Sequence, residues 1–399
     1  MTESDSSLPL AGIRVVEFTH MVMGPVVGLI LADLGADVIK IEPPGGDKTR
    51  RLPGSGAGYF PMYNRNKRSI CLDTKSEQGQ AVARRLCERA DVVIENFRPG
   101  AMERLGLGYE VLADANPALI YCSLKGFLNG PYEHRTALDE VTQMMGGLAY
   151  MTGLPGKPMR AGASVVDVTG GMFGVIAILA ALEQRHRSGL GQHVQSSLFE
   201  TTGFLVGQHM AQHAVTGQSL QPMSVRTSAW AVYDVFETAD DQQLFVAVVS
   251  DSQWVLFCDA FGLTEFADDT SLAANGDRVK QRDRILPVIR ERLGRLDKQA
   301  LMDQLEHTGL PFAPIATPED LFDDPQLNAG GLVEVTLADG NKAKLPAMPV
   351  AFGSKRPGLR CDLPGIDAEL ADVLGSSGYL PTEVEAIIGA TVAPQAATG

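Results

Sequence analysis

The chain has 399 residues, of which 45% are hydrophobic and 21% are charged, so it can bury a sizeable core and has room for two domains. Its net charge of −14 argues against nucleic acid or an anionic membrane as the main partner. An anionic small ligand is not excluded, because a local cluster of Lys and Arg can override the overall sign.

Cysteine use and apolar runs narrow the class of protein further. The five cysteines are scattered without the spacing of a zinc site, which favours free thiols and argues against a structural metal. The polar, acidic N-terminus does not resemble a signal peptide. The longest apolar run, residues 172–182, is shorter than the roughly 18 residues of a membrane span. We therefore expect a cytoplasmic protein with no membrane partner.

The first part of the chain alternates between short strands and helices. Residues 13–18 and 37–42 are predicted strands, and they flank a predicted helix over residues 26–34. A strand, a helix and a strand within about 30 residues indicate a βαβ unit with parallel strands. Such sheets bind ligands beyond the carboxyl ends of their strands. The GxGxxG sequence is absent here, which argues against a nicotinamide cofactor.

The alternation continues to about residue 210. The further predicted strands are residues 68–72, 91–95 and 118–124. The further predicted helices are residues 75–90, 102–105, 109–115 and 139–146. Residues 194–210 continue as strand and helix. This repeated alternation predicts an open, doubly wound α/β sheet.

The pattern changes after Gln212, where residues 217–228 form a polar linker. The predicted elements beyond it are a hairpin of residues 230–237 and 244–249, helices at 252–261, 280–293 and 298–308, a loop at 311–314, a helix capped by Thr317 with Pro318 as its first residue, a second hairpin of residues 333–337 and 342–345, a helix at 381–389 and an unstructured tail at 390–399. We expect a large domain over residues 1–224, a small α+β domain over 225–325 and a C-terminal segment over 326–399.

Asp167 is the candidate for chemistry. A strand-like run over residues 162–166 leads to it, Gly170 and Gly171 follow, and an apolar helix ends at Gly189. At a helix N-terminus, free N–H groups and the helix dipole favour an ionised carboxylate. We expect the two glycines to leave room for a bulky ligand. Because Asp is a preferred N-cap residue, capping is the simpler interpretation of this stretch alone, and a catalytic carboxylate is the alternative.

Five stretches at predicted strand ends together carry a family resemblance. They are residues 18–25, 32–42, 66–70, 95–100 and the Asp167 stretch, which closes at residues 188–192. In this order they resemble the class III CoA-transferase family, which includes formyl-CoA:oxalate and carnitine CoA-transferases and the α-methylacyl-CoA racemases. The resemblance is clear over residues 10–216 and looser to about residue 380. It implies a Rossmann-like large domain to which the C-terminal segment returns, and an interlocked homodimer.

The resemblance also implies a reaction. Asp167 would attack an acyl-CoA thioester and form an aspartyl anhydride and then an aspartyl-CoA thioester, from which a free carboxylic acid takes CoA. We expect succinyl-CoA as donor, a short dicarboxylate as acceptor, and no metal or redox cofactor. The residues that would contact CoA are His20, Met21, Val22, Met23, Leu72, Lys75, Asn96, Phe97 and Arg104. Asp139 is a candidate either for a group that supports the nucleophile from behind or for the acceptor side. Arg226 is a candidate for the acceptor side, because a guanidinium can bind a carboxylate bidentately.

Taken singly, several of these residues have structural explanations. Lys75 can be a solvated helix start, and His20 can be a hydrogen-bonded loop residue. Asn96 can be a turn residue. Arg104 can pair with Glu103 or Glu110.

The chain also departs from two branches of the family. Oxalate-acting members have Gln at the position of Val22, and Lys and Tyr roughly at Thr136 and Leu138. They also have a tetraglycine loop that residues 217–230 lack. These differences argue against formyl-CoA and oxalate as the substrate pair. Racemases have His-Asp where this chain has Leu138-Asp139, so two-base proton transfer loses one partner. An acyl-CoA racemase or epimerase, and a CoA-binding subunit that needs a paralogous partner, remain the alternatives.

Overall fold

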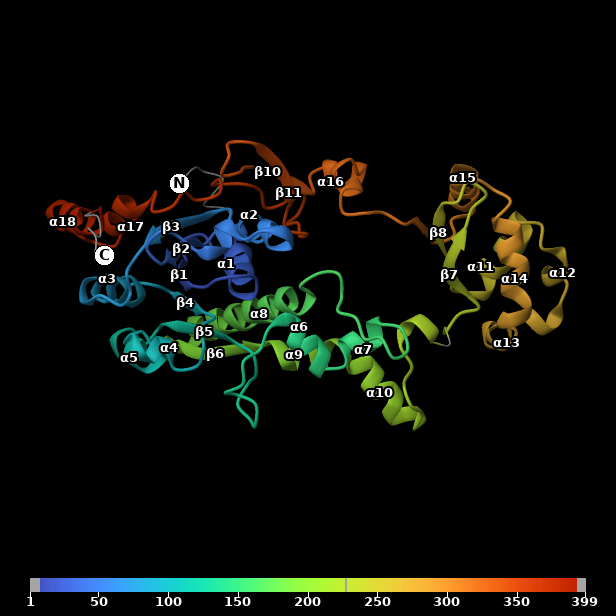
Figure 1. The fold of residues 1–399 in the computed structure, drawn as a ribbon, viewed down its shortest axis with the longest axis horizontal. Helices are drawn as coiled ribbons and strands as arrows, with labels where there is room; N and C mark the ends of the chain where they lie inside the picture. The colour runs from blue at the N-terminus through green and yellow to red at the C-terminus, as the bar shows by residue number, and fades with distance from the viewer. Residues whose placement is uncertain (1–7, 227, 393–399) are drawn as a thin grey trace. The chain divides into compact units, whose positions relative to one another are not determined.

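The computed structural model describes residues 8–226 and 228–392, and the chain divides into two compact units (Figure 1). One unit comprises Met1–Ser224 and Pro325–Gly399, and the other comprises Val225–Asp324. Residues 393–399, most of the predicted tail, lie outside the described residues.

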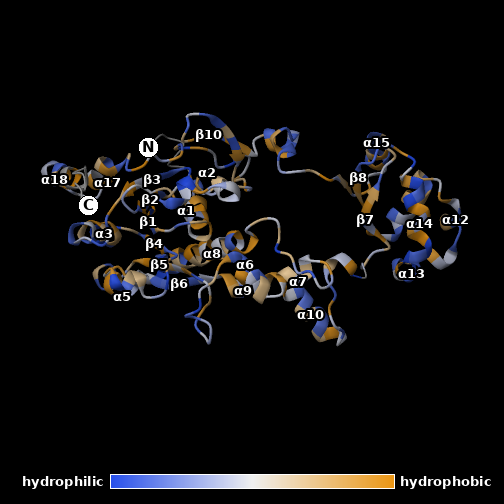
Figure 2. Ribbon diagram, viewed as in Figure 1, coloured by the Kyte–Doolittle hydropathy of each residue, from blue (hydrophilic) through white to orange (hydrophobic). Residues whose placement is uncertain are grey.

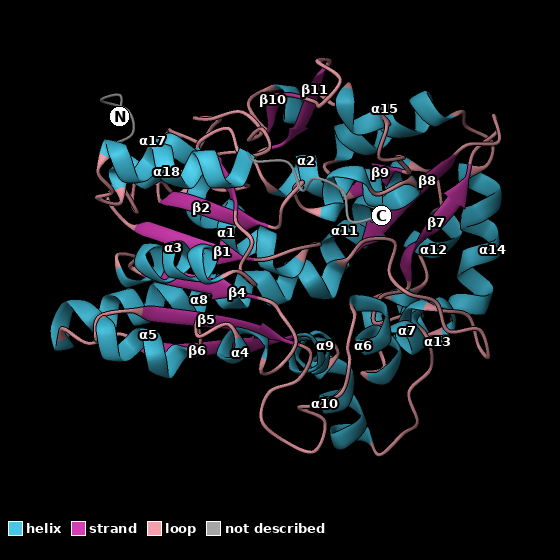
Figure 3. Cartoon of the chain, turned by 60° about the vertical axis from the view of Figure 1, so that its left-hand side comes forward, coloured by secondary structure: helices cyan, strands magenta, loops and turns pink. Residues whose placement is uncertain are grey.

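A six-stranded parallel sheet forms the centre of the first unit, in the order β3-β2-β1-β4-β5-β6. Figure 3 shows β2, β1, β4, β5 and β6 side by side with helices around them. The strands are β1 (Arg14–Phe18), β2 (Asp37–Glu42), β3 (Lys67–Cys71), β4 (Val92–Glu95), β5 (Ile120–Lys125) and β6 (Gln192–Ser197). This is the doubly wound order, so the predicted fold class is confirmed. The strand order reverses between β1 and β4: the strands after β1 add to one side of the sheet, and those after β4 add to the other. A crevice opens at the carboxyl ends of the strands at such a point.

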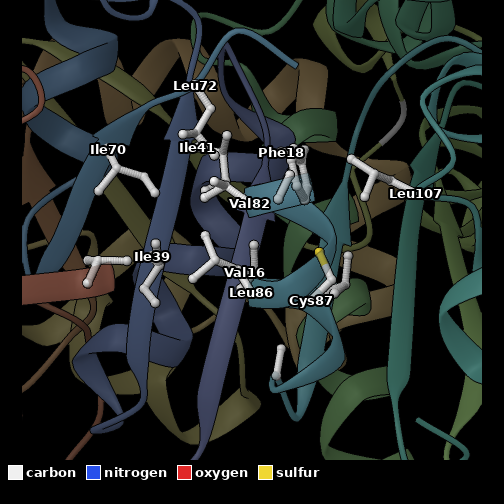
Figure 4. Close-up of a cluster of buried hydrophobic side chains, with 14 of the residues drawn as sticks. Val16, Phe18, Ile39, Ile41, Ile70, Leu72, Val82, Leu86, Cys87 and Leu107 are labelled. Atoms are coloured by element: carbon white, nitrogen blue, oxygen red, sulfur yellow. The ribbon is translucent and has the colours of Figure 1, made fainter. Parts of the chain in front are cut away.

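Two hydrophobic layers sandwich the sheet, because successive strand residues point to opposite faces. Val16 packs against α3 (Glu77–Glu88) in the cluster drawn in Figure 4, whereas its neighbour Val15 packs toward α1 (Met23–Asp33) and α8 (Val165–Ser188). The other helical elements of this part are η2 (Lys48–Arg51), η3 (Gly54–Gly58), α2 (Tyr59–Tyr63), α4 (Ala101–Arg104), α5 (Tyr109–Ala115), α6 (Asp139–Met145), α7 (Leu148–Thr152), α9 (Leu198–Leu205), α10 (Gly207–Thr216) and η4 (Met223–Val225).

Helix α8 is longer than its predicted apolar core, and residues 162–166 are not the strand that the sequence suggested. The helix begins at Val165, because the apolar run that looked strand-like is its first turn. Among the described residues it is the one helix long and apolar enough to cross a membrane. It contacts α1, β5 and β6, and Val166, Ile178 and Leu182 lie in the core. These contacts are those of a core helix.

The C-terminal segment packs on the first unit. Its elements are α16 (Pro325–Asn328), the antiparallel hairpin of β10 (Leu332–Thr336) and β11 (Lys342–Pro346), α17 (Leu370–Ser376) and α18 (Pro381–Val392). The hairpin was predicted. Edge strand β3 donates two backbone N–H groups to this segment: Ser69 to Glu369 at 3.0 Å and Cys71 to Asp367 at 2.8 Å. Leu374 of α17 adds to the core beside α3.

The second unit packs helices on a three-stranded antiparallel sheet, β7-β8-β9, around Trp254, Phe257 and Leu301. Figure 2 shows blue and orange bands along α14, as expected of a helix with one buried face. The elements are β7 (Val232–Glu237), β8 (Gln243–Val248), α11 (Asp251–Ala260), α12 (Thr264–Ala267), η5 (Thr270–Leu272), α13 (Asn275–Lys280), α14 (Arg282–Leu293), α15 (Lys298–Thr308), β9 (Phe312–Pro314) and η6 (Asp320–Phe322).

The predicted β7–β8 hairpin is present, but three details of the prediction in this unit are wrong. The helix predicted over residues 280–293 is α14, which begins two residues later, and the short helix α13 before it was not predicted. The loop at residues 311–314 holds strand β9, which pairs with β8. Thr317 is not an N-cap, because its N–H and hydroxyl groups donate to the Asp320 carboxylate instead.

Candidate active site

A cavity of about 910 Å³ opens at the point where the strand order reverses. Its walls come from the loops after β1, β4 and β5, from the start of α6 and from the first turn of α8. The candidate residues that line it are His20, Met21, Val22, Met23, Asn96, Phe97, Arg104, Asp139 and Asp167. Segments that lie far apart in the sequence therefore meet here, as expected for the carboxyl ends of parallel strands.

The loops after β1 and β4 are joined by Asn96. Its side-chain oxygen accepts from the His20 N–H at 3.1 Å, and its amide donates to the His20 carbonyl at 2.9 Å. Asn96 is thus a bridge between two walls of the cavity rather than a plain turn residue. The rings of His20 and Phe97 lie 5.8 Å apart on this wall. Met21, between His20 and Val22, has a φ of 65° and is 41% exposed.

Asp167 lies inside the first turn of α8, so it is not the N-cap. The N-cap residue is Ser164, whose side chain makes no capping hydrogen bond. The Asp139 carboxylate takes that role from a separate helix. Its Oδ2 accepts from the N–H groups of Val166 at 2.9 Å and Asp167 at 3.1 Å. The amides that we expected to stabilise the Asp167 carboxylate therefore serve Asp139.

Asp139 is held from several sides and is buried. Gln143 donates its side-chain amide to Asp139 Oδ1 at 2.6 Å and accepts the Ala161 N–H at 2.8 Å. The Arg160 guanidinium lies 3.5 Å from the same carboxylate. Two backbone amides, one side-chain amide and one guanidinium thus surround the Asp139 carboxylate.

The Asp167 carboxyl is in a different environment. Burial, and secondarily the Asp139 charge, raise its pKa to about 7, and Arg160 acts in the opposite direction. The expectation of a fully ionised carboxylate is therefore wrong at neutral pH, because the helix amides are engaged by Asp139 and the side chain is desolvated. A carboxylate with a raised pKa is also more basic, and hence a stronger nucleophile once it is ionised.

The glycines after Asp167 do not leave room for a ligand. A Cβ on Gly171 would lie 2.9 Å from the Met23 carbonyl oxygen, and one on Gly170 would lie 2.7 Å from the Met23 side chain. Gly174, one turn later, would meet Leu124 at 2.9 Å. These glycines let α8 pack closely against α1 and β5, and they thereby fix the position of Asp167 relative to the loop after β1.

Three candidate residues do not line the cavity. Leu72 is buried in the core beside α3, and Lys75 is exposed just before that helix, which begins at Glu77 and is capped by Ser76. Arg226 belongs to the second unit.

The cavity contains groups that the sequence prediction did not assign. They are Tyr59, Arg98, Lys125, Arg135, Arg160 and Ser164. Arg98 lies within the 95–100 stretch, so its motif was available as a signal. Arg160 precedes Asp167 by seven residues in a loop, and no local pattern places it beside Asp139. No ion pair within 4.0 Å joins Arg104 to Glu103 or Glu110, so its guanidinium is not neutralised by either of them.

Within residues 8–226 and 228–392, no group of three or more His, Cys, Asp or Glu side chains is arranged to hold a metal ion. The cavity instead combines the Asp167 carboxyl, the apolar side chains of Val22 and Met23, and four arginines: Arg98, Arg104, Arg135 and Arg160. Such a site can bind an extended anionic ligand and present a carbonyl to Asp167.

Comparison with known proteins agrees with this geometry. The model of CoA-transferase family III matches residues 10–369. The chain is 38% identical over 346 residues to the succinate–glutarate CoA-transferase of Agrobacterium fabrum, covering 83% of this chain and 86% of that protein. It is 35% identical over 369 residues to the acetyl-CoA:oxalate CoA-transferase of Acetobacter aceti, covering 90% and 94%.

A solved structure shows the same fold. The crystal structure of a CAIB/BAIF family protein from Brucella suis is similar with a TM-score of 0.81 and 35% sequence identity, and the match covers 93% of this chain and 99% of that one.

Proposed function

Because the chain belongs to CoA-transferase family III, we propose that it moves CoA from an acyl-CoA to a free carboxylic acid with Asp167 as nucleophile. The observation that carries this proposal is the position of Asp167. It lies in the cavity with the loops after β1 and β4, on a helix that close glycine packing fixes in place. Related proteins named for succinate and glutarate support succinyl-CoA as donor and a short dicarboxylate as acceptor.

The proposed reaction is a sequence of acyl transfers. An Asp167 oxygen attacks the thioester carbonyl carbon, the C–S bond breaks, and an aspartyl anhydride and CoA thiolate result. The thiolate attacks the Asp167 carbonyl carbon, and the anhydride C–O bond breaks. The donor carboxylate departs, and an aspartyl-CoA thioester remains. The acceptor carboxylate then repeats these steps in reverse. No net proton transfer is needed, but Asp167 must be ionised to begin.

We assign Asp139 a positioning role in this reaction. Its two hydrogen bonds to the α8 amides set the start of the helix that carries Asp167. Burial and, secondarily, the Asp139 charge keep the Asp167 pKa high, which preserves nucleophilicity. Of the two roles expected for Asp139 from the sequence, the site geometry supports the one behind the nucleophile over the acceptor contact.

CoA would lie along the loops of the cavity. His20, Met21, Phe97 and Asn96 form the wall for the pantetheine arm, and the guanidinium of Arg104 neutralises phosphate charge. Because Lys75 does not line the cavity, we restrict its proposed contact to the part of CoA outside it, and we propose no contact for Leu72, which is buried in the core. Arg226 remains the proposed contact for the acceptor's second carboxylate, and it rests on guanidinium chemistry alone.

Two further expectations remain proposals. The interlocked homodimer rests on the family resemblance. A cytoplasmic location rests on the sequence, and neither changes the chemistry assigned to Asp167.

The test is a panel of acyl-CoA donors and carboxylic acid acceptors with the wild type and Asp167→Asn. We expect transfer by the wild type alone, and an Asp167 peptide that carries a covalent CoA adduct when the acceptor is withheld. Near-normal transfer by Asp167→Asn would refute the mechanism. Deuterium incorporation at the α-carbon without an acceptor would instead indicate a racemase. Inactivity of the purified chain, restored by a second subunit, would indicate a subunit role.

A further inference from the structure

A cluster of four buried charges lies behind the loop after β1, outside the cavity. Its members are Glu17 of β1, Lys40 of β2, Lys67 of β3 and Asp47, all at most 5% exposed. Lys67 Nζ lies 2.9 and 3.1 Å from the two Glu17 carboxylate oxygens. Lys40 Nζ lies 3.2 Å from the Asp47 carboxylate and 3.8 Å from Glu17. Two ammonium groups and two carboxylates balance in charge, as a buried cluster requires.

Both ammonium groups also donate to the loop itself. Lys40 Nζ donates to the Thr19 carbonyl at 2.7 Å, and Lys67 Nζ donates to the Pro25 carbonyl at 3.0 Å. These two carbonyls bracket the residues that line the cavity, His20 to Met23. Charge-assisted hydrogen bonds are stronger than neutral ones, so each end of the loop is fixed to a different strand of the sheet.

The loop between these anchors has a conformation that it would not adopt alone. Met21 is left-handed, with a φ of 65°, which is unfavourable for a residue with a side chain. Such strain persists only where the surroundings impose it. Lys40 at one end, Lys67 at the other and Asn96 at His20 supply three constraints on a short segment.

Helix α1 makes room for this cluster. A Cβ on Gly28 would lie 1.7 Å from a Glu17 carboxylate oxygen and 2.9 Å from Lys67 Nζ. The glycine therefore lets the charged groups reach the space directly beneath the loop.

We propose that Lys40 and Lys67 are positioning residues that hold the segment from Thr19 to Pro25, the loop after β1 with the first turn of α1, in the shape that receives CoA. This inference rests on the proposed function, because it assigns the loop to CoA. Neither lysine touches the substrate; each acts through a backbone carbonyl. The loss of one anchor should weaken CoA binding more than it slows the chemistry at Asp167, which lies on a different element.

The test uses the paired variant Glu17→Gln with Lys67→Met, which removes the Pro25 anchor without leaving a single unpaired charge in that ion pair. We expect the dissociation constant for CoA and the KM for the acyl-CoA to rise about tenfold, the free-energy equivalent of one charge-assisted hydrogen bond. The KM for the acceptor acid and kcat should change less than about threefold. Binding of CoA itself is measured by calorimetry.

The matched control is Asp33→Asn with Arg65→Met. That ion pair is equally buried, at 2.7 Å between Arg65 Nη2 and Asp33 Oδ2, and it donates to neither end of the loop. It should lower the melting temperature and leave CoA affinity within about twofold of wild type. If the Glu17–Lys67 variant is folded and binds CoA as the wild type does, the proposal is wrong.

Further measurements distinguish a failure of this inference from misfolding and from a failure of the proposed function. If the first variant does not fold, Lys40→Met with Asp47→Asn removes the other anchor and carries the same expectation. If neither folds, amide hydrogen exchange of the wild type decides: exchange of residues 20–22 as fast as that of the exposed residues 134–136 would overturn the proposal. If the wild type binds CoA but transfers none, the proposed function is wrong. The positioning role of the two lysines is then still tested by the CoA affinity of the variants.

Discussion

Replacing Asp167 with Asn should make the protein more stable at pH 8 while abolishing CoA transfer. Burial, and secondarily the Asp139 charge, raise the Asp167 pKa from 3.8 to about 7. An acid whose pKa is higher in the folded state binds its proton more tightly there than in the unfolded chain. Ionisation of Asp167 therefore favours unfolding, and this penalty grows as the pH rises from about 3.8 to about 7 and is constant above that.

The size of the penalty follows from the shift. At about 1.4 kcal/mol for each pKa unit, a rise from 3.8 to about 7 corresponds to about 4 kcal/mol. Because the side chain is only partly buried, we expect a gain on the order of 2–4 kcal/mol for the Asn variant. A neutral amide of the same shape avoids the desolvated charge and the repulsion from Asp139.

The assay is urea unfolding of both proteins at several pH values. The gain should be largest at pH 8, less than half as large near pH 5, and small near pH 4, because it vanishes only where Asp167 is protonated in both the folded and the unfolded chain. Glu140→Gln is the matched control, since Glu140 is the neighbour of Asp139 but its side chain is 58% exposed. It should change stability by less than about 0.5 kcal/mol. A gain in stability that is absent, or that does not depend on pH, would contradict the assignment of a desolvated Asp167 carboxylate with a raised pKa.

Four other changes test separate features of the structure. In a pH profile, kcat should fall as the pH drops through about 7, and Asp139→Asn should move the midpoint downward, because the Asp139 charge raises the Asp167 pKa. Met21→Gly should be about 1 kcal/mol more stable in urea unfolding than Met21→Ala, since only glycine tolerates the left-handed φ without cost; equal stability would argue against strain. Arg104→Ala should raise the KM for acyl-CoA about tenfold, whereas Lys75→Ala should raise it less than about twofold. A larger effect of Lys75→Ala would instead place the CoA phosphates near α3. Gly28→Ala should lower the free energy of unfolding by about 1–3 kcal/mol or more, because its Cβ would collide with Glu17; an unchanged midpoint in thermal melting would show that the buried charges can move aside.

The central sheet was predictable because its information is local. Apolar runs such as the one that became β4 and the amphipathic pattern of α3 are visible in short windows, and the alternation of strands and helices allows few topologies. The errors occur where tertiary contacts decide. The first turn of α8 has the apolar composition of a strand, and β9 becomes a strand only because β8 offers it a partner.

The candidate site was predictable to the extent that residues share a strand end. Asn96 and His20 were found from their stretches, and the structure brings them into one hydrogen-bonded pair. The role of Asp139 was not predictable, because it caps a helix that begins 26 residues later in the chain, and no spacing rule connects the two. The raised pKa of Asp167 follows from that same long-range contact and from burial, neither of which a sequence displays.

Carboxylates also close the outer edge of the sheet, where Glu369 and Asp367 accept the free N–H groups of β3. An uncovered edge strand is a template for pairing with another chain. A shortened protein that ended before Asp367 would keep Asp167 and the walls of the cavity, yet leave the Ser69 and Cys71 N–H groups of β3 without these acceptors. Its expected failure is strand-to-strand aggregation rather than loss of the site, so residues far along the chain from the cavity protect the solubility of the protein.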